Sequence, residues 1–190
     1  MLTRLLQRNL LVRKLVLRLC SALALIAPSM GARIWLNRAK GVQMGRHPWI
    51  GGMVYLDIHH SHPDAANSLV FGDHVAIGNN VSIFTHSSLY TQVTEGREPV
   101  EFGRVVIGDH VNVSPHAFLY ACTIGDHSIV APGAVVAGGE YPPYSMIAGN
   151  PAKVVKDIRS RVERSRGEGD GRADRAGGVD DGAGDRAASS

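Results

Sequence analysis

Residues 107–118 read Ile107-Gly-Asp-His-Val-Asn and then Val113-Ser-Pro-His-Ala-Phe, two six-residue units that each begin with an aliphatic residue. The same unit recurs before and after this stretch. Its first positions are Phe71, Ile77, Ile83, Leu89, Ile107, Val113, Leu119, Ile124, Val130 and Val136. A short fixed period that repeats many times is the signature of a solenoid. Ordinary hairpins with Gly-Asp or Gly-Asn turns are the alternative, but hairpins do not keep a period of six over so many units.

The composition of the unit predicts how the solenoid is built. The first position is apolar and should point inward, where it stacks on its equivalents in neighbouring coils. The fifth position is Ala, Ser, Thr or Val in most units, which suits a narrow interior. Gly-Asp and Gly-Asn at the second and third positions supply turn chemistry. We therefore expect an all-β solenoid over residues 47–153, with three parallel strands per turn and a stability summed over adjacent coils.

Four segments lie outside this regular repeat. Residues 1–46 are rich in leucine and arginine and predict a basic amphipathic helical arm. Residues 90–104 interrupt the repeat with a polar excursion, and loops of this kind on a rigid scaffold commonly carry function. Residues 154–164 predict a short helix. Residues 165–190 consist largely of Gly, Arg, Asp, Ala and Ser without an apolar period, so we expect them to be disordered.

Charge is distributed unevenly along the chain. Up to residue 46 there are nine basic residues and no acidic one, whereas residues 57–157 hold ten acidic residues against four basic ones. The arm could cap the end of the solenoid, or residues 1–28 could lie on an anionic membrane surface. The uncharged run 19–31 is too short to span a bilayer, and the basic residues extend too far for a secretory signal. Nucleic-acid binding is disfavoured because aromatic residues are not interleaved with the basic ones.

The two cysteines indicate a reducing compartment and provide no disulfide framework. Cys20 and Cys122 offer neither a disulfide framework nor a metal-binding pair. This usage suits a reducing compartment, and we expect a cytoplasmic protein, with the arm allowing peripheral attachment to the inner face of the membrane.

The repeats, the excursion and the ending Tyr141-Pro-Pro-Tyr-Ser-Met-Ile-Ala-Gly-Asn-Pro-Ala-Lys-Val-Val-Lys resemble the hexapeptide-repeat acyltransferases. The resemblance covers about residues 50–158 and is greatest to the branch of galactoside, maltose and nodulation-type sugar O-acetyltransferases. It implies a left-handed parallel β-helix and a homotrimer, with acetyl-CoA bound between adjacent subunits as the acyl donor. The acceptor would be a hydroxyl of a sugar or glycoconjugate, and a role in polysaccharide biosynthesis would suit the arm.

Such a transfer needs a general base, and histidine titrates in the useful range. His86, in Ile-Phe-Thr-His-Ser-Ser, departs from the Gly-Asp-His pattern and precedes the excursion, as the base does in the resembled family. It is our first candidate, and His116 is the second. Histidines that follow Gly-Asp are interpreted as exposed turn residues. These are His74, His110 and His127. His59, His60 and His62 precede the regular repeats and could line an acceptor pocket.

The resemblance also implies a set of residues for the acyl donor. Lys153 and Lys156 match a basic pair that meets the CoA phosphates. Ala131 and Ala137 match small residues beside the pantetheine arm, and Ser114 and Gly149 would line the same groove. Asp57 falls loosely at an acceptor-binding position.

Three other functions remain open at this stage. A serine-type O-acetyltransferase shares the repeat, although the long helical N-terminal domain typical of that type is absent. A γ-class carbonic anhydrase would need three zinc ligands; His86, His110 and His116 could be proposed, but the usual His-x₄-His spacing is missing, and we expect no metal. A non-catalytic trimeric scaffold is the third alternative.

Overall fold

The computed structural model describes residues 10–59 and 61–166. The chain divides into two compact units, Met1–Ile158 and Arg159–Ser190. The described part of the second unit is a helix over residues 159–166. Most of the tail that we expect to be disordered, from residue 167 onward, lies outside the described residues.

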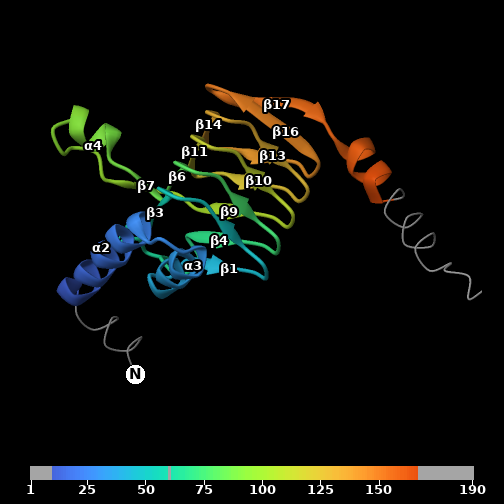
Figure 1. Ribbon diagram of the computed structural model, residues 1–190. Coiled ribbons are helices and arrows are strands. Elements are labelled where there is room, and N and C mark those ends of the chain that lie inside the picture. Colours follow the sequence, from blue (N-terminus) through green and yellow to red (C-terminus); the bar gives the residue numbers. More distant parts are fainter. Residues whose placement is uncertain (1–9, 60, 167–190) are drawn as a thin grey trace, which may run out of the picture. The chain divides into compact units, whose positions relative to one another are not determined.

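The first unit is built on three sheets of parallel strands, which the chain visits in turn (Figure 1). The first sheet contains β1 (Gln43–Met44), β4 (Leu69–Phe71), β9 (Val105–Ile107), β12 (Thr123–Ile124) and β15 (Glu140–Tyr141). The second contains β2 (Trp49–Ile50), β5 (Ala76–Ile77), β10 (Asn112–Val113), β13 (Ile129–Val130) and β16 (Ser145–Gly149), with β17 (Ala152–Asp157) at its edge. The third contains β3 (Tyr55–Asp57), β6 (Ser82–Phe84), β11 (Phe118–Tyr120) and β14 (Val135–Ala137). The repeating order of three sheets makes this unit a three-sided parallel solenoid, which begins at Gln43, four residues before the expected start.

The inward column expected from the repeat is present in each sheet. Ile83 pairs with Leu119 and Leu119 with Val136, and all three side chains have no exposed surface. Most fifth positions are buried as well, including Val111, Ala117 and Ser128, whereas Ser87 and Thr123 are half-buried. Leu89 is the exception, because it is 74% exposed and begins helix α4 (Leu89–Val93). The expectation that Leu89 continues the column is therefore wrong, since the chain has already left the third sheet.

The three corners of the prism have different structures. In the corner between the first and second sheets, the first corner, the Asp73 carboxylate accepts the backbone N–H of Arg46 in the preceding coil. Asp109 and Asp126 repeat this contact from coil to coil. A Cβ at Gly72 would lie 2.9 Å from the Asp109 nitrogen, which explains the glycine of the Gly-Asp pair. The aromatic rings of this corner stack 4.7–5.1 Å apart in the order His47, His74, His110, His127 and Tyr144.

The second corner lies between the second and third sheets, and the third corner between the third and first. Both large excursions leave from the third corner. The first covers residues 58–68, and the second covers residues 85–104 and contains α4. Strands β7 (His86–Ser87) and β8 (Glu101–Phe102) pair antiparallel and close the base of the second excursion. The excursion predicted as polar in fact exposes Tyr90 and Val93 at 55% and 76%.

Two helices precede the solenoid, α2 (Leu10–Ile26) and α3 (Met30–Ala39). Ser29 caps the start of α3 by accepting the N–H of Ala32. Figure 1 shows both helices at the end of the stack formed by β1 and β3. Among the described residues, no helix combines the length and the apolarity needed to cross a membrane.

Three basic side chains in and just after α3 bind carbonyl groups of the first coil. Arg33 donates to the Ile50 carbonyl in the second sheet at 3.0 Å, and Arg38 to the Met44 carbonyl in the first sheet at 3.2 Å. Lys40 donates to the Leu56 carbonyl in the third sheet. A strand edge with unsatisfied carbonyls is costly when it is covered. These cations therefore give α3 the capping role that was one of the two interpretations of the arm.

The other end of the stack is formed by β17, which pairs antiparallel with β16 and has an irregular register between Met146 and Ile147. The expected helix over 154–164 is wrong in its first part. Two adjacent β-branched residues, Val154 and Val155, favour a strand, and β16 offers them an open edge. The helix begins only at residue 159.

Candidate active site

His86 contacts a carboxylate that lies one coil below it. Its Nδ1 is 2.7 Å from Oδ2 of Asp57, which is the length of a charge-assisted hydrogen bond. The contact is bent away from ideal hydrogen-bond alignment, and neither atom has another polar partner among the described residues. Misaligned contacts of this kind are common in catalytic sites without bound substrate. With Nδ1 directed at the carboxylate, Nε2 is the ring nitrogen of His86 that remains for another partner.

Neighbouring groups hold Asp57 in place. The Tyr55 hydroxyl lies 3.2 Å from Oδ1 of Asp57 and donates to it. Burial and the charge of Asp57 both raise the pKa of Tyr55, so its hydroxyl stays protonated as a donor. Thr85, which has no exposed surface, donates its hydroxyl to the Asp57 carbonyl at 3.0 Å. The Tyr55 contact orients the carboxylate within β3, and the Thr85 contact ties β3 to the chain just after β6.

The two excursions pack against each other around His86. The ring of His59 lies 4.6 Å from that of His86 and 5.5 Å from that of Phe102. His62 is buried, and its Nε2 lies 3.2 Å from the Gly103 carbonyl. Of the three histidines expected near an acceptor pocket, His59 lies at the site, His62 holds backbone, and His60 lies outside the described residues.

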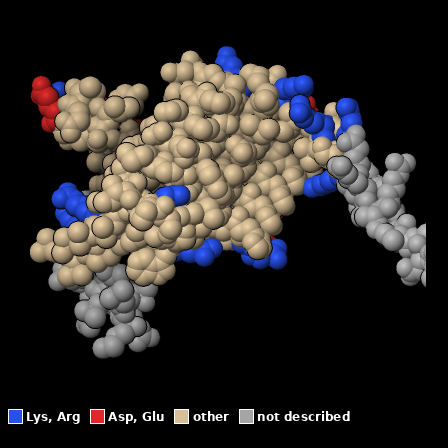
Figure 2. All heavy atoms as spheres, in the orientation of Figure 1, with Lys and Arg blue, Asp and Glu red and all other residues tan. Residues whose placement is uncertain are grey.

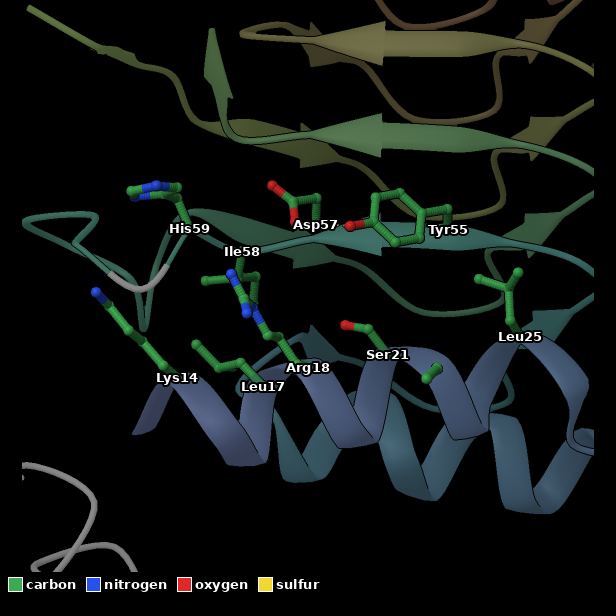
Figure 3. A pocket seen from close by; sticks show the side chains of 10 residues that line it. Lys14, Leu17, Arg18, Ser21, Leu25, Tyr55, Asp57, Ile58 and His59 are labelled. Atoms are coloured by element: carbon green, nitrogen blue, oxygen red, sulfur yellow. Dashed lines mark hydrogen bonds between the residues drawn. The ribbon is translucent and has the colours of Figure 1, made fainter. Parts of the chain in front are cut away.

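A cavity of about 520 Å³ lies between α2 and β3. Tyr55, Asp57 and His59 line it on the side of the solenoid. Figure 3 shows the helix side chains reaching toward that strand from the opposite wall. The helix residues that line the cavity are Lys14, Leu17, Arg18, Ser21, Ala22 and Leu25. Cavities of this size hold small-molecule ligands, and Asp57 is shared between this one and the His86 contact.

Lys40 lies behind this cavity and is 7% exposed. Its ammonium group lies 3.2 Å from the hydroxyl of Ser21, a cavity residue, in addition to the Leu56 carbonyl. Burial lowers the pKa of Lys40 to about 8, although the charge of Asp57 acts in the opposite direction. The lysine therefore remains mainly protonated at neutral pH, close to the underside of the site.

The other candidate histidines lie elsewhere. His116 is exposed in the second corner, between β10 and β11, whereas His86 is in the third corner. His110 belongs to the stacked rings of the first corner. Within one chain the three histidines considered as zinc ligands thus occupy three different corners. The described residues contain no group of three or more His, Cys, Asp or Glu side chains that could hold a metal ion.

The residues expected to bind the acyl donor fall on two corners. Ser114 follows β10 and Ala131 follows β13, so the two lie one above the other at the second corner, because β10 and β13 pair in register. Gly149 ends β16 at the same corner, and Lys153 pairs with Ala148 beside it. Lys156 is further along β17. Ala137 instead ends β14 at the third corner, two coils above Phe84.

The sequence pattern does not reveal the partner of His86. Asp57 was placed loosely as an acceptor residue, and Tyr55, Thr85 and Lys40 were not singled out. Aligning Leu56 with Ile83 as equivalent column residues would have placed Asp57 beside Phe84, as the register does. The first excursion separates these two positions by 27 residues instead of about 18 and hides the alignment.

Known proteins resemble this chain in sequence and in fold. No protein-family model matches it. It is 27% identical over 139 residues to galactoside O-acetyltransferase of Escherichia coli K12, covering 70% of this chain and 65% of that protein. It is 31% identical over 153 residues to serine acetyltransferase 4 of Arabidopsis thaliana, covering 74% of this chain and 40% of that one. The chain thus spans less than two thirds of the length of each of these relatives.

A crystal structure of a hexapeptide-repeat acetyltransferase from Vibrio cholerae, complexed with acetyl coenzyme A, superposes with a TM-score of 0.60 at 22% identity. The superposition covers 77% of this chain and 87% of that one. At this identity the likeness establishes the fold, and it agrees with the resemblance drawn from the repeats. The two sequence relatives of this chain are thus acetyltransferases, and a hexapeptide-repeat acetyltransferase shares its fold.

Proposed function

We propose that this protein transfers an acetyl group from acetyl-CoA to a hydroxyl group of a sugar or glycoconjugate, with His86 as general base. The observation that carries the proposal is the 2.7 Å contact between His86 Nδ1 and the carboxylate of Asp57, a residue that lines the cavity. The sequence relatives support the reaction class, because both are acetyltransferases.

In the proposed reaction, Nε2 of His86 takes the proton from the acceptor hydroxyl as its oxygen attacks the thioester carbonyl. Asp57 accepts the hydrogen bond from Nδ1–H and stabilises the imidazolium that forms. The tetrahedral intermediate then expels the CoA thiolate, which receives the proton from His86. A positioned base contributes a factor of roughly 10²–10⁴. The described chain offers no acyl-enzyme nucleophile of the Gly-x-Ser-x-Gly type, and none is required.

The acyl donor would lie along the small residues of the second corner. Ser114, Ala131 and Gly149 form a row without large side chains, which suits a narrow pantetheine arm. Lys153 and Lys156 are exposed at the end of this row and carry the charge that CoA phosphates require. His86 and Ala137 belong to the third corner, so a single chain separates the base from most of this row.

A homotrimer resolves that separation, because the third corner of one subunit can face the second corner of the next. Exposed apolar residues support such contacts. Leu89 and Val93 on α4 are 74% and 76% exposed, and Val155 on β17 is 58% exposed. We also assign a left hand to the solenoid, as the resemblance implies. Light scattering that returned a fully active monomer would rule out the composite site.

The outer face of α2 suits peripheral attachment to a membrane at the cytoplasmic side. Val12, Leu15, Leu19 and Leu23 are 40–58% exposed, and Ile26 is 74% exposed. Figure 2 shows few charged atoms over α2 in this view. We expect wild type to bind anionic vesicles and the variant Leu15→Gln/Leu19→Gln/Leu23→Gln to bind them much more weakly, with acetyl transfer to a soluble acceptor retained. Equal vesicle binding by the two proteins would contradict this role.

The central experiment measures release of the CoA thiol with a panel of sugars, nucleotide sugars and amino acids, including serine because one relative is a serine acetyltransferase. His86→Ala should lower kcat by about 10²–10⁴ with little change in acetyl-CoA affinity. His116→Ala is the matched control, since it removes the rival histidine of the second corner. If only His116→Ala abolishes turnover, the base lies in the second corner, between β10 and β11.

A further inference from the structure

The basic residues of the N-terminal arm have two different uses. Arg33, Arg38 and Lys40 bind carbonyl groups of the first coil, as described above. Lys14 and Arg18 of α2 bind no such carbonyl and make no ion pair with a described residue. Both line the cavity between α2 and β3. Their charge is therefore directed to the cavity and is not used to close the end of the solenoid.

The face of α2 that lines the cavity is distinct from its exposed apolar stripe. The cavity residues recur at the three- and four-residue spacing of one helical face. In Figure 3 Lys14 and Arg18 extend from this face toward His59 and Ile58. The exposed leucines Leu15, Leu19 and Leu23 occupy another face. This face combines Leu17 and Leu25 with two cations, so it does more than cover an apolar edge.

The cavity has an excess of positive charge. Among the described residues that line it, Asp57 alone is acidic, and this carboxylate already contacts Tyr55 and His86. No acidic residue precedes Asp57 in the sequence, so α2 supplies no counter-ion of its own. Lys40 adds a third positive charge behind Ser21. Two cavity cations and a buried one together favour a ligand group with more than one negative charge.

We infer that the cavity is the acceptor site and that it binds a saccharide carrying a phosphate group, with Lys14 and Arg18 holding the phosphate. The sugar hydroxyl then lies toward Asp57 and His86. Arginine binds phosphate through two parallel hydrogen bonds and lysine binds it as a point charge. A cavity of about 520 Å³ accommodates a sugar phosphate. This inference rests on the proposed function, and it adds the chemical class of the acceptor and the contribution of the arm to specificity.

The phosphate could belong to a soluble sugar nucleotide or to a lipid-linked sugar. The chemistry that Lys14 and Arg18 recognise is the same in both. The test therefore compares each methyl glycoside with the 1-phosphate of the same sugar, and then with the corresponding nucleoside diphosphate sugar and a lipid-linked sugar phosphate in detergent micelles.

Binding is measured by calorimetry on the full chain in the His86→Ala background, which separates ligand recognition from turnover. A 1-phosphate should bind at least about tenfold more tightly than its methyl glycoside, as expected for a charge-assisted contact. Arg18→Gln and Lys14→Gln should each remove much of this preference. Arg161→Gln, which removes the same charge from the second compact unit, should leave the preference intact. Circular dichroism verifies that each variant is folded, and Arg18→Lys should retain part of the preference.

Equal binding of neutral and phosphorylated sugars, or a phosphate preference that survives in the double variant Lys14→Gln/Arg18→Gln, would overturn the inference. A preference for either the soluble or the lipid-linked phosphate supports it and identifies the source. Failure of the proposed function has a different signature. In that case wild type would transfer no acetyl group to any acceptor, while binding of the 1-phosphates and its loss in Arg18→Gln could still be measured.

Discussion

Replacing Asp57 with Asn removes the charge that faces His86 and changes little else. The side chains have the same shape, and the Asn carbonyl can still accept from Tyr55. Its amide group, however, would donate to Nδ1 of His86 and favour the tautomer that carries its proton on Nε2. That nitrogen is the one that must accept the proton of the acceptor, so both the charge and the correct tautomer are lost.

The contact geometry sets the size of the effect. The Nδ1–Oδ2 distance is 2.7 Å, and the His86 and Asp57 side chains are only 24% and 16% exposed, so solvent screens the pair weakly. A hydrogen bond to a charged group is worth about 1.5–3 kcal/mol. Since 1.36 kcal/mol corresponds to a factor of ten in rate, the loss of the charge alone should lower kcat by about 10- to 150-fold.

The assay compares kcat for acetyl transfer with the affinity for acetyl-CoA in wild type, Asp57→Asn and Tyr55→Phe. Asp57→Asn should lower kcat and leave the acetyl-CoA affinity unchanged. Tyr55→Phe removes a hydroxyl without removing the charge and should cost only a few-fold. Nitrogen-15 NMR of labelled histidine should show His86 protonated on Nδ1 in wild type and on Nε2 in the variant. A folded Asp57→Asn protein with kcat within twofold of wild type would refute the role assigned to this carboxylate.

The remaining predictions concern stability and the acyl donor. Val113→Asp should destabilise the fold by several kcal/mol, because Val113 has no exposed surface and an unpaired charge would enter the column; urea unfolding measures this, with the smaller cost of Val113→Ala as the control. Burial lowers the pKa of Lys40 from 10.5 to about 8 in the folded state. The free energy of unfolding should therefore rise with pH between pH 8 and 10.5, by up to about 1.4 kcal/mol per pH unit. The sign is positive because the unfolded chain holds a proton that the folded one has released; Lys40→Met should lack this rise, and an identical pH dependence in both proteins would contradict it. Burial raises the pKa of the Cys122 thiol to about 12. This thiol therefore lowers the free energy of unfolding as the pH rises, and it does so equally in wild type and in Lys40→Met. Lys153→Gln should raise the Kd for acetyl-CoA several-fold in calorimetry without changing the Kd for methyl glycosides. An unchanged Kd for acetyl-CoA would show that Lys153 does not belong to the donor site.

The repeat made the parallel column predictable because its period reflects one side chain per strand, and residues such as Ile83, Leu119 and Val136 satisfy it without reference to the rest of the chain. His86 could be singled out because it breaks that period. Its partner could not, because the distance along the chain from Asp57 to His86 depends on the length of an excursion that follows no period.

The arm was predictable as helical and basic, but the two different roles of its basic residues were not. Lys14 and Arg18 are indistinguishable in sequence from Arg33 and Arg38. Only the position of α3 against the carbonyl groups of the first coil separates the cations that cap strands from those that face a cavity. The helix expected at 154–164 was misplaced for a similar reason, since a free strand edge at β16 is a tertiary feature that Val154 and Val155 exploit.

The two ends of the stack have a consequence for association in solution. Parallel coils present strand edges that could pair with another copy end to end and grow into a fibre. At one end, Arg33, Arg38 and Lys40 already occupy carbonyl groups of the first coil, and α2 and α3 cover the stack. At the other, β17 runs opposite to the strands beneath it and is irregular in register. A second molecule therefore meets no open parallel edge at the helical end. At the other end an antiparallel strand closes the second sheet, while the first and third sheets end at β15 and β14. Pairing in register over all three sheets at once is thus blocked, so the molecule can repeat its unit many times within one chain without extending end to end into a fibre.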